Sequence, residues 1–212
     1  MALPDIPPWA TRLFGDWGTS RLRLWLAHEN AITPWREGPG IGALDRPAEA
    51  VVRALVADLP AVERPAKIVL CGMAGARGGL HEAGYVDCPA NQIGWGRQAT
   101  RITFDGIPLV IGAGVAIAVS GPVSAQRADV MRGEETQVFG AIARHPALAT
   151  GRHTLLLPGT HSKWVDIEDG AITGFTTFVT GELYALLGKS TLLAAGDQGE
   201  DGRGRALVSA LA

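Results

Sequence analysis

This sequence has few cysteines and a small net charge. Its 212 residues include two cysteines, Cys71 and Cys88, which lack the spacing of metal ligands. So few cysteines favour reduced thiols and a cytoplasmic protein. The 19 Lys and Arg side chains nearly balance 21 Asp and Glu, which leaves a formal charge of −2. This balance gives no electrostatic reason to expect nucleic acid or an anionic membrane as a partner.

Long hydrophobic runs are also missing. The longest, residues 109–119, is interrupted by glycines and is too short to cross a bilayer. Residues 1–10 hold three prolines and no basic stretch, unlike a signal peptide. The composition is that of a globular protein, 47% hydrophobic and 19% charged. It is sufficient for a sizeable core in one large or two small domains.

Residues 14–20 (Phe-Gly-Asp-Trp-Gly-Thr-Ser) lie between two short hydrophobic segments. Leucines recur at every second position over residues 22–26, which predicts a strand and places a hairpin turn before it. The carboxylate of Asp16 suits a Mg²⁺ ion that keeps its water. Backbone N–H groups and hydroxyls in such a turn suit phosphate oxygens, and they come from Gly18, Thr19 and Ser20. Taken alone, an ordinary hairpin is the simpler interpretation of this stretch.

Helix and strand patterns alternate over the next hundred residues. Residues 47–59 carry apolar side chains at a helical repeat, and residues 68–70 are a short apolar run suited to a buried strand. A glycine-rich loop, residues 72–79, follows at the edge where ligands of α/β sheets tend to bind. We expect irregular structure over residues 85–95 and one strand over residues 107–120. These patterns indicate an α/β fold.

Later in the chain, a helix is predicted over residues 133–144. Residues 154–157 predict a buried strand and residues 163–167 another strand, with the turn of residues 158–161 between them. Further predicted elements are an Asp-Gly hairpin turn at residues 169–170 and a helix over residues 181–187. A strand, a turn with Gly, Thr and Ser, and another strand therefore occur twice in the sequence. Such an echo is typical of two lobes that each offer one turn to the phosphates of a nucleotide.

Three stretches resemble, in order, motifs of the 2-dehydro-3-deoxygalactonokinase family. They are residues 16–20, residues 129–137 (Asp-Val-Met-Arg-Gly-Glu-Glu-Thr-Gln) and residues 157–164 (Leu-Pro-Gly-Thr-His-Ser-Lys-Trp). Residues 71–77, 88–90 and 180–183 also look like segments of that family. The similarity runs from about residue 12 to about residue 193, and the Arg-Gly-Glu-Glu-Thr-Gln run is its most specific part.

The resemblance implies an α/β protein with the actin-like ATPase fold. Its first, ribonuclease H-like lobe would span residues 11–150, and residues 151–212 would start a second, incomplete lobe. The implied activity is ATP-dependent phosphorylation of 2-dehydro-3-deoxy-D-galactonate to its 6-phosphate, with ATP and Mg²⁺ as cofactors. A homodimer is an allowed assembly, and no nucleic acid or membrane partner is implied.

The resemblance also implies roles for individual residues. Asp16 would act in catalysis through Mg²⁺. Glu134 would be the catalytic base, with Asp129 and Glu135 as alternatives because relatives carry Asp at the position of Glu134. Seven residues would bind the phosphates of ATP: Gly18, Thr19, Ser20, Gly159, Thr160, Ser162 and Lys163. Five would bind the sugar acid: Arg132, Glu135, Gly72, Met73 and Asn91.

Ordinary structural roles compete with several of these assignments. Acids at positions 134 and 135 suit the first turn of a helix, where the helix dipole favours negative charge. A surface salt bridge would explain Arg132, and a hairpin turn would explain both Gly-Thr-Ser stretches. Each residue taken alone is therefore weaker evidence than the ordered set of motifs.

The end of the sequence departs from the family pattern. Residues 196–205 are polar and glycine-rich, unlike the family sequence, so we expect a second lobe that is cut short. Two other functions stay open: an inactive sugar-acid- or phosphate-binding module of the same fold, and a phosphatase of the same superfamily. The combination of Arg132, Asn91 and Gln92 argues against the phosphatase, which needs no sugar-acid pocket.

Overall fold

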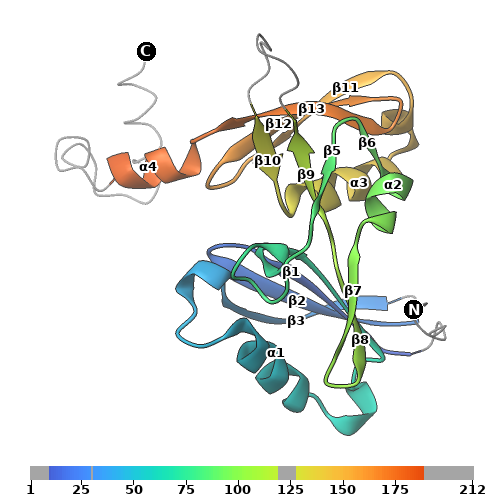
Figure 1. Ribbon diagram of the computed structural model, residues 1–212, viewed down its shortest axis with the longest axis vertical. Coiled ribbons are helices and arrows are strands. Elements are labelled where there is room, and N and C mark those ends of the chain that lie inside the picture. The colour runs from blue at the N-terminus through green and yellow to red at the C-terminus, as the bar shows by residue number, and fades with distance from the viewer. Residues whose placement is uncertain (1–9, 30, 119–127, 189–212) are drawn as a thin grey trace.

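The chain folds into two halves, which lie one above the other in Figure 1. The computed structural model describes residues 10–29, 31–118 and 128–188. Each half has its own sheet or sheets and its own cluster of buried hydrophobic side chains. The chain crosses between the halves more than once, because the strands within residues 85–117 contribute to both.

The first half is built on a six-stranded sheet in the order β3-β2-β1-β4-β8-β7. The predicted hairpin is confirmed as β1 and β2, which pair antiparallel with Asp16 opposite Arg23. Strand β4 lies parallel to β1 on one side and to β8 on the other. The bounds are β1 Arg12–Trp17, β2 Arg21–His28, β3 Ala31–Pro39, β4 Lys67–Gly72, β7 Thr100–Phe104 and β8 Ile107–Ile111.

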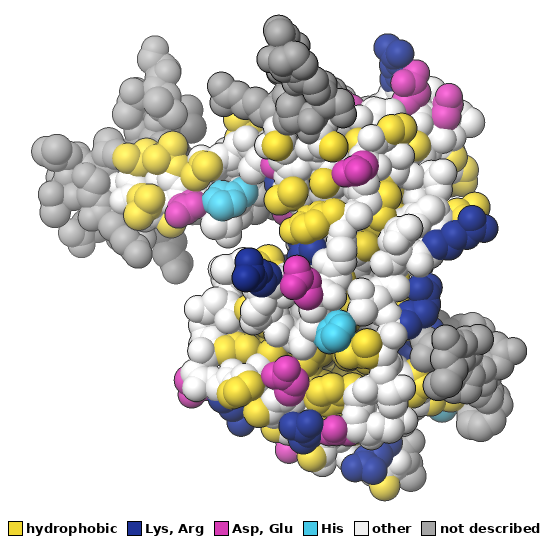
Figure 2. Space-filling model, viewed as in Figure 1, with side chains coloured by type: hydrophobic (Ala, Val, Ile, Leu, Met, Phe, Trp, Pro, Cys, Tyr) yellow, Lys and Arg dark blue, Asp and Glu magenta, His cyan; other side chains and the backbone are white. Residues whose placement is uncertain are grey.

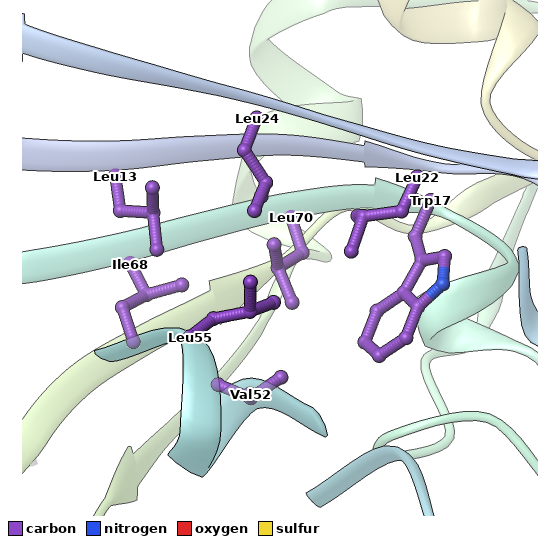
Figure 3. A pocket seen from close by; sticks show the side chains of 8 residues that line it. All are labelled: Leu13, Trp17, Leu22, Leu24, Val52, Leu55, Ile68 and Leu70. Atoms are coloured by element: carbon purple, nitrogen blue, oxygen red, sulfur yellow. The ribbon is translucent and has the colours of Figure 1, made fainter. Parts of the chain in front are cut away.

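Helix α1 (Ala48–Ala57) covers one face of this sheet, where the helical repeat predicted a helix. Leu13 and Trp17 of β1 point to that face and are almost fully buried, whereas Asp16 lies on the opposite face. A small apolar cavity between sheet and helix is lined by eight hydrophobic side chains, all labelled in Figure 3. Its lining offers no charged group to a ligand, so we treat it as a gap in core packing.

The second half combines two sheets, ordered β10-β9-β5 and β11-β12-β13-β6, with helix α3 (Glu134–Arg144). One face of α3 carries Val138, Phe139 and Ile142 into a core that also contains Val165 and Ile172. The strands are β5 Tyr85–Asp87, β6 Ala90–Asn91, β9 Gly114–Ile117, β10 Asp129–Met131, β11 Arg152–Leu157, β12 Ser162–Glu168 and β13 Ala171–Phe178. Helices α2 (Gln92–Arg97) and α4 (Gly181–Leu187) complete it.

Two predictions for the middle of the chain are wrong. Residues 85–95, expected to be irregular, form β5, β6 and the start of α2. Residues 107–120, expected to be one strand, form β8 and β9 in different sheets, and residues 119–120 lie outside the described part of the chain. Gly114 shows why β9 can lie so close to β5: a Cβ there would stand 2.5 Å from the Tyr85 ring.

The predictions for the later part of the chain are mostly confirmed. Helices α3 and α4, strand β12 and the Asp-Gly hairpin turn at residues 169–170 all form. Strand β11 also forms, but one face of its sheet is open: Thr154 and Leu156 are exposed, as are Asp166 and Trp164 opposite them on β12, so the expected burial is wrong. The predicted lobe boundary near residue 150 stays a prediction. The α3 core combines side chains from before and after that position.

No helix within residues 10–29, 31–118 and 128–188 is both long enough and apolar enough to span a bilayer.

Candidate active site

Three chain segments meet where the ends of β1 and β4 face the start of α3. Gly72 ends β4 with φ +76°, and a Cβ there would lie 2.7 Å from the Trp17 carbonyl oxygen and 3.4 Å from Oδ1 of Asp16. Gly133 precedes α3 with φ +112°, and a Cβ on it would lie 3.2 Å from Cα of Gly72. Glycine alone readily combines positive φ with so close an approach. We call this meeting point of Asp16, Gly72 and Gly133 the glycine junction.

Asp16 supplies the carboxylate of the glycine junction. Its side chain is 26% exposed, and its Oδ2 lies 3.7 Å from Nη2 of Arg23 on the neighbouring strand. The thiol of Cys71 lies 3.9 Å from its Oδ1. These weak contacts leave oxygen lone pairs open to a Mg²⁺-bound water. Among the described residues, no cluster of three or more His, Cys, Asp or Glu could hold a metal alone, so an ion here would complete its shell with water and with oxygens from a substrate.

The two acids that begin α3 have different surroundings. Glu134 is half-buried, and its Oε2 accepts a hydrogen bond from the Arg132 backbone N–H at 3.1 Å. Glu135 is fully buried, and both of its carboxylate oxygens accept from the Gly133 N–H at 2.8 Å. Both acids lie in the first turn, where the sequence placed them, but Glu134 alone of the two is accessible from outside.

Burial changes the protonation of two groups beside the glycine junction. Loss of water raises the pKa of Glu135 to about 8, although the hydrogen bond from Gly133 opposes the rise. Burial also raises the pKa of the Cys71 thiol to about 12, and the nearby charges of Asp16 and Glu135 add to it. Cys71 is therefore a neutral thiol at neutral pH, which is incompatible with a nucleophilic role.

The turn of the first hairpin, residues 18–20, is exposed on top and braced from beneath. The carbonyl oxygens of its first two residues accept hydrogen bonds, each at 3.0 Å, from the N–H groups of Ile41 and Gly42. These donors belong to the short 3-10 helix η1 (Ile41–Ala43). The side chains of Thr19 and Ser20 face solvent, so their hydroxyls are accessible to a ligand.

The turn of the second hairpin, residues 158–161, is braced in the same way. The carbonyl oxygens of Gly159 and Thr160 accept hydrogen bonds from the N–H groups of Gly181 and Glu182, at 3.2 and 3.0 Å. Both donors belong to the first turn of α4, which extends away from the body of the molecule in Figure 1. On the face seen in Figure 2, the surface is hollowed between the two halves, below the place of α4. Acidic and basic side chains lie together on the lower edge of this hollow.

Ser162 and Lys163, two predicted phosphate ligands, have partners inside the protein. Both side chains are about 6% exposed, and the Ser162 hydroxyl is hydrogen-bonded to that of Thr180. The Lys163 ammonium donates to the Val130 carbonyl at 2.6 Å and lies 3.5 Å from Oδ1 of Asp129. Lys163 and Asp129 therefore tie β10 to β12 within the second half.

Arg132, a predicted sugar-acid ligand, directs its donors into the protein. Its Nη2 donates to the carbonyl oxygen of Ala83 at 2.8 Å, and its guanidinium stacks on the Tyr85 ring at 4.2 Å from the ring centroid. Its Nη1 is buried against Gly75, with no hydrogen-bond partner in the part of the chain that the structure describes. Arg132 therefore holds residues 83–85 against the end of β10.

The remaining predicted sugar-acid residues lie apart. Met73 follows the glycine junction directly, in the 3-10 helix η3 (Met73–Gly75). Asn91 caps α2, where its side chain accepts the Gly94 N–H at 2.8 Å. Sequence reasoning gave no site role to Gly133 or to Cys71, whose thiol lies beside Asp16. The available signals were a glycine directly before a helix that starts with two acids, for Gly133, and the family-like stretch of residues 71–77, for Cys71.

Comparison with known proteins agrees with the motifs. Residues 16–212 match the 2-keto-3-deoxy-galactonokinase family. The chain is 39% identical over 181 residues to the probable 2-dehydro-3-deoxygalactonokinase of Rhizobium meliloti (strain 1021). It is 34% identical over 182 residues to the 2-dehydro-3-deoxygalactonokinase of Escherichia coli (strain K12). The alignments cover 84% and 85% of this chain but 56% and 58% of the relatives. The chain thus spans little more than half the length of these curated relatives.

A crystal structure agrees with the same assignment. A protein of Sinorhizobium meliloti, provisionally named as a 2-dehydro-3-deoxygalactonokinase, matches with a TM-score of 0.73 and 36% identity. The match covers 91% of this chain and 60% of that one. The expected fold class, α/β with the actin-like ATPase architecture, is thereby confirmed. With its motifs, its architecture and residues 16–212 all in agreement, the chain belongs to the 2-keto-3-deoxy-galactonokinase family.

Proposed function

We propose that this protein transfers the terminal phosphoryl group of ATP to 2-dehydro-3-deoxy-D-galactonate, a 2-keto-3-deoxy sugar acid, and yields its 6-phosphate. The observation that carries the proposal is the glycine junction, which brings the partly exposed carboxylate of Asp16 to the start of the helix that bears Glu134. Phosphoryl transfer asks a protein mainly for positioning, charge neutralisation and one proton acceptor. The names of the relatives support the choice of sugar acid.

Glu134 is the proposed general base. The Arg132 N–H holds one of its oxygens at 3.1 Å, which orients the carboxylate so that the other oxygen can accept the proton of the attacking hydroxyl. The two alternative bases have worse access. Asp129 is engaged with Lys163 and with the Thr177 hydroxyl, and Glu135 is fully buried.

The proposed phosphate site combines Asp16 with the two hairpin turns. A single carboxylate fits Mg²⁺, which uses one or two protein carboxylates and completes its shell with water and phosphate oxygens. When bound, the ion would neutralise charge on the phosphates. Turn residues that are open to solvent would contact the phosphates directly: Gly18, Thr19, Ser20, Gly159 and Thr160. Ser162 and Lys163 would act indirectly, because they hold the base of the second turn.

The sugar acid is proposed to lie beside Gly72 and Met73, next to the base. Because the donors of Arg132 are directed into the protein, we propose that it shapes the wall formed by residues 83–85 and does not bind the sugar carboxylate itself. Asn91 lies one short helix away, and we retain it as a more distant contributor. A reducing, cytoplasmic setting is supported by the two free thiols, Cys71 and Cys88. A homodimer stays a prediction for sedimentation analysis to test.

A coupled ADP-release assay over a panel of 2-keto-3-deoxy sugar acids tests the proposal. We expect Mg²⁺-dependent ADP release that is fastest with 2-dehydro-3-deoxy-D-galactonate. Titration calorimetry with the same acids separates the alternatives. Binding without ADP release would support an inactive sugar-acid-binding module. Phosphate release from the 6-phosphate in the absence of ADP would support a phosphatase.

A further inference from the structure

We infer that Glu135 is a positioning residue that fixes the Gly133 turn, and through it the relative placement of Asp16 and Glu134. The inference rests on the proposed kinase function and deepens it. The resemblance implied a direct substrate contact for Glu135. Its side chain is fully buried, however, which leaves it no surface to offer a substrate.

Hydrogen bonds tie the side chain of Glu135 to the backbone of Gly133. The Gly133 N–H donates to both carboxylate oxygens of Glu135, each at 2.8 Å, in buried surroundings. Gly133 has φ +112°, outside the conformation of the helix that follows, so its N–H has no place in the regular helical pattern. Glu135 is therefore the acceptor that makes this backbone conformation compatible with burial.

Gly133 lies between the residues that carry the two functional carboxylates, Asp16 and Glu134. In one direction it packs on Gly72: a Cβ on Gly133 would lie 3.2 Å from the Gly72 Cα, and a Cβ on Gly72 would lie 3.4 Å from Oδ1 of Asp16. In the other direction Gly133 is bonded directly to Glu134. A movement of the Gly133 turn would therefore displace the proposed base and the proposed Mg²⁺ ligand relative to each other.

A small displacement of a reacting group has a large effect on the reaction rate. Misplacement of a reacting group by about 1 Å can lower a reaction rate about 10²-fold without any loss of the group itself. Glu135 touches no substrate in this arrangement, so its loss should lower kcat and leave the affinity for ATP largely unchanged. Loss of a residue that merely stabilises the fold would not lower kcat while it left the affinity for ATP unchanged.

Two substitutions and one control test the inference in the full chain. Glu135→Met removes the acceptor with little change in volume, whereas Glu135→Gln retains an acceptor oxygen for Gly133. Val138→Ala is the control, because Val138 is equally buried one turn later on the same helix and packs in the core with Phe139 and Ile142. The readouts are the ¹⁵N amide resonances of Gly72 and Gly133, and kcat and KM in the ADP-release assay.

We expect Glu135→Met to move both amide resonances and to lower kcat about 10²-fold, with the KM for ATP little changed. Glu135→Gln should keep the wild-type amide resonances and the wild-type kcat. Val138→Ala should lower the melting temperature but change neither the two resonances nor kcat. If Glu135→Met does not fold, Glu135→Asp replaces it, because the shorter side chain withdraws the carboxyl from Gly133.

The inference would be overturned if the amide resonances of Gly72 and Gly133 did not shift in Glu135→Met. It would also be overturned if kcat fell as far in Glu135→Gln as in Glu135→Met. Absence of ADP release by the unmodified chain would instead contradict the proposed kinase function. The amide spectra would still decide whether Glu135 sets the geometry of the glycine junction.

Discussion

The two hairpin turns are built on one backbone scheme but lie in different surroundings. In each, two successive turn carbonyls accept hydrogen bonds from two successive N–H groups at the start of a later helical segment. In each, a glycine makes the approach possible. A Cβ on Gly40 would lie 2.3 Å from the Thr19 oxygen, and one on Gly181 would lie 2.4 Å from the Gly159 oxygen. The echo seen in the sequence therefore extends to the way the turns are supported.

The surroundings differ in burial and in charge. The first turn follows Trp17, which is fully buried against the α1 core, and it adjoins the glycine junction with Asp16. The second turn is held by α4, whose Leu183, Tyr184 and Leu186 are exposed. The two turns thus have the same backbone support in different surroundings. We place the Mg²⁺-directed carboxylate at the first turn, because of the two turns this one adjoins the glycine junction with Asp16.

The largest effect is expected from removal of the Asp16 charge beside the first turn. Asp16→Asn keeps the size of the side chain and removes the charge directed at Mg²⁺. Charge stabilisation by a metal ion is worth several kcal/mol, so kcat should fall about 10³-fold while the fold is retained. The measurement is ADP release at several Mg²⁺ concentrations, with circular dichroism as the folding check.

Glu182→Gln is the matched control at the second hairpin. Its carboxylate is about half exposed and contacts His161 at 2.7 Å, so the substitution should leave kcat nearly unchanged. Equal losses in the two variants, or wild-type turnover in Asp16→Asn, would show that the two hairpins do not divide the chemistry as proposed.

Local spacing explains why so much of this comparison was visible in the sequence. Leucines at every second position predicted β2, and the Asp-Gly pair predicted the β12–β13 turn, where Asp169 and Gly170 both have positive φ. Long-range pairing explains what was missed. Strand β6 pairs with β13 through Asn91 and Ala171, so nothing in residues 85–95 alone marks it as a strand. The partners of Lys163 and Arg132 are equally remote along the chain.

The second prediction uses Glu135, the buried acid beside the glycine junction. The folded state favours the neutral form of Glu135, with a pKa of about 8, against an ordinary value of 4.5 in the unfolded chain. Between these values the unfolded chain loses the proton first, so the stability that Glu135 contributes at low pH is lost as pH rises through about 8. The slope is at most about 1.4 kcal/mol per pH unit.

Urea unfolding between pH 5 and pH 9, compared across variants, measures this contribution. Glu135→Gln should remove most of the slope, because the amide cannot ionise. The exposed acid of the second hairpin serves as control, and Glu182→Gln should keep the wild-type slope. The same pH dependence in wild type and Glu135→Gln would mean that Glu135 is ionised in the folded protein. Arg132 and Glu134, the charged neighbours on its own segment, would then be the first groups to re-examine.

The third prediction compares the glycines that support the two turns. Gly40→Ala would place a Cβ within 2.5 Å of backbone atoms of Thr19 and Arg21, so the turn or η1 must move. Overpacking of this kind costs about 1–3 kcal/mol of unfolding free energy. Gly181→Ala should cost less, because α4 is largely exposed and can shift away from Gly159. Chemical denaturation measures both.

Gly140→Ala is the control for the glycine pair. This position lies on the exposed side of α3 with open space around it, so alanine should be neutral or should stabilise by up to about 1 kcal/mol. Equal losses at Gly40 and Gly181 would show that α4 is held as firmly as the first turn. The different burial of the two turns would then have no effect on the unfolding free energy.

The smallest expected effect concerns one serine from each hairpin. Ser162 is buried and shares a hydrogen bond with Thr180, so Ser162→Ala should lower the unfolding free energy by about 0.5–1.5 kcal/mol. Ser20 is exposed, so Ser20→Ala should change stability by less than about 0.5 kcal/mol. The KM for ATP should rise more for Ser20→Ala than for Ser162→Ala. Ser20 is a proposed phosphate contact, whereas Ser162 supports the second turn from inside the protein. A KM that rises for Ser162→Ala but not for Ser20→Ala would assign the direct phosphate contact to the second hairpin instead.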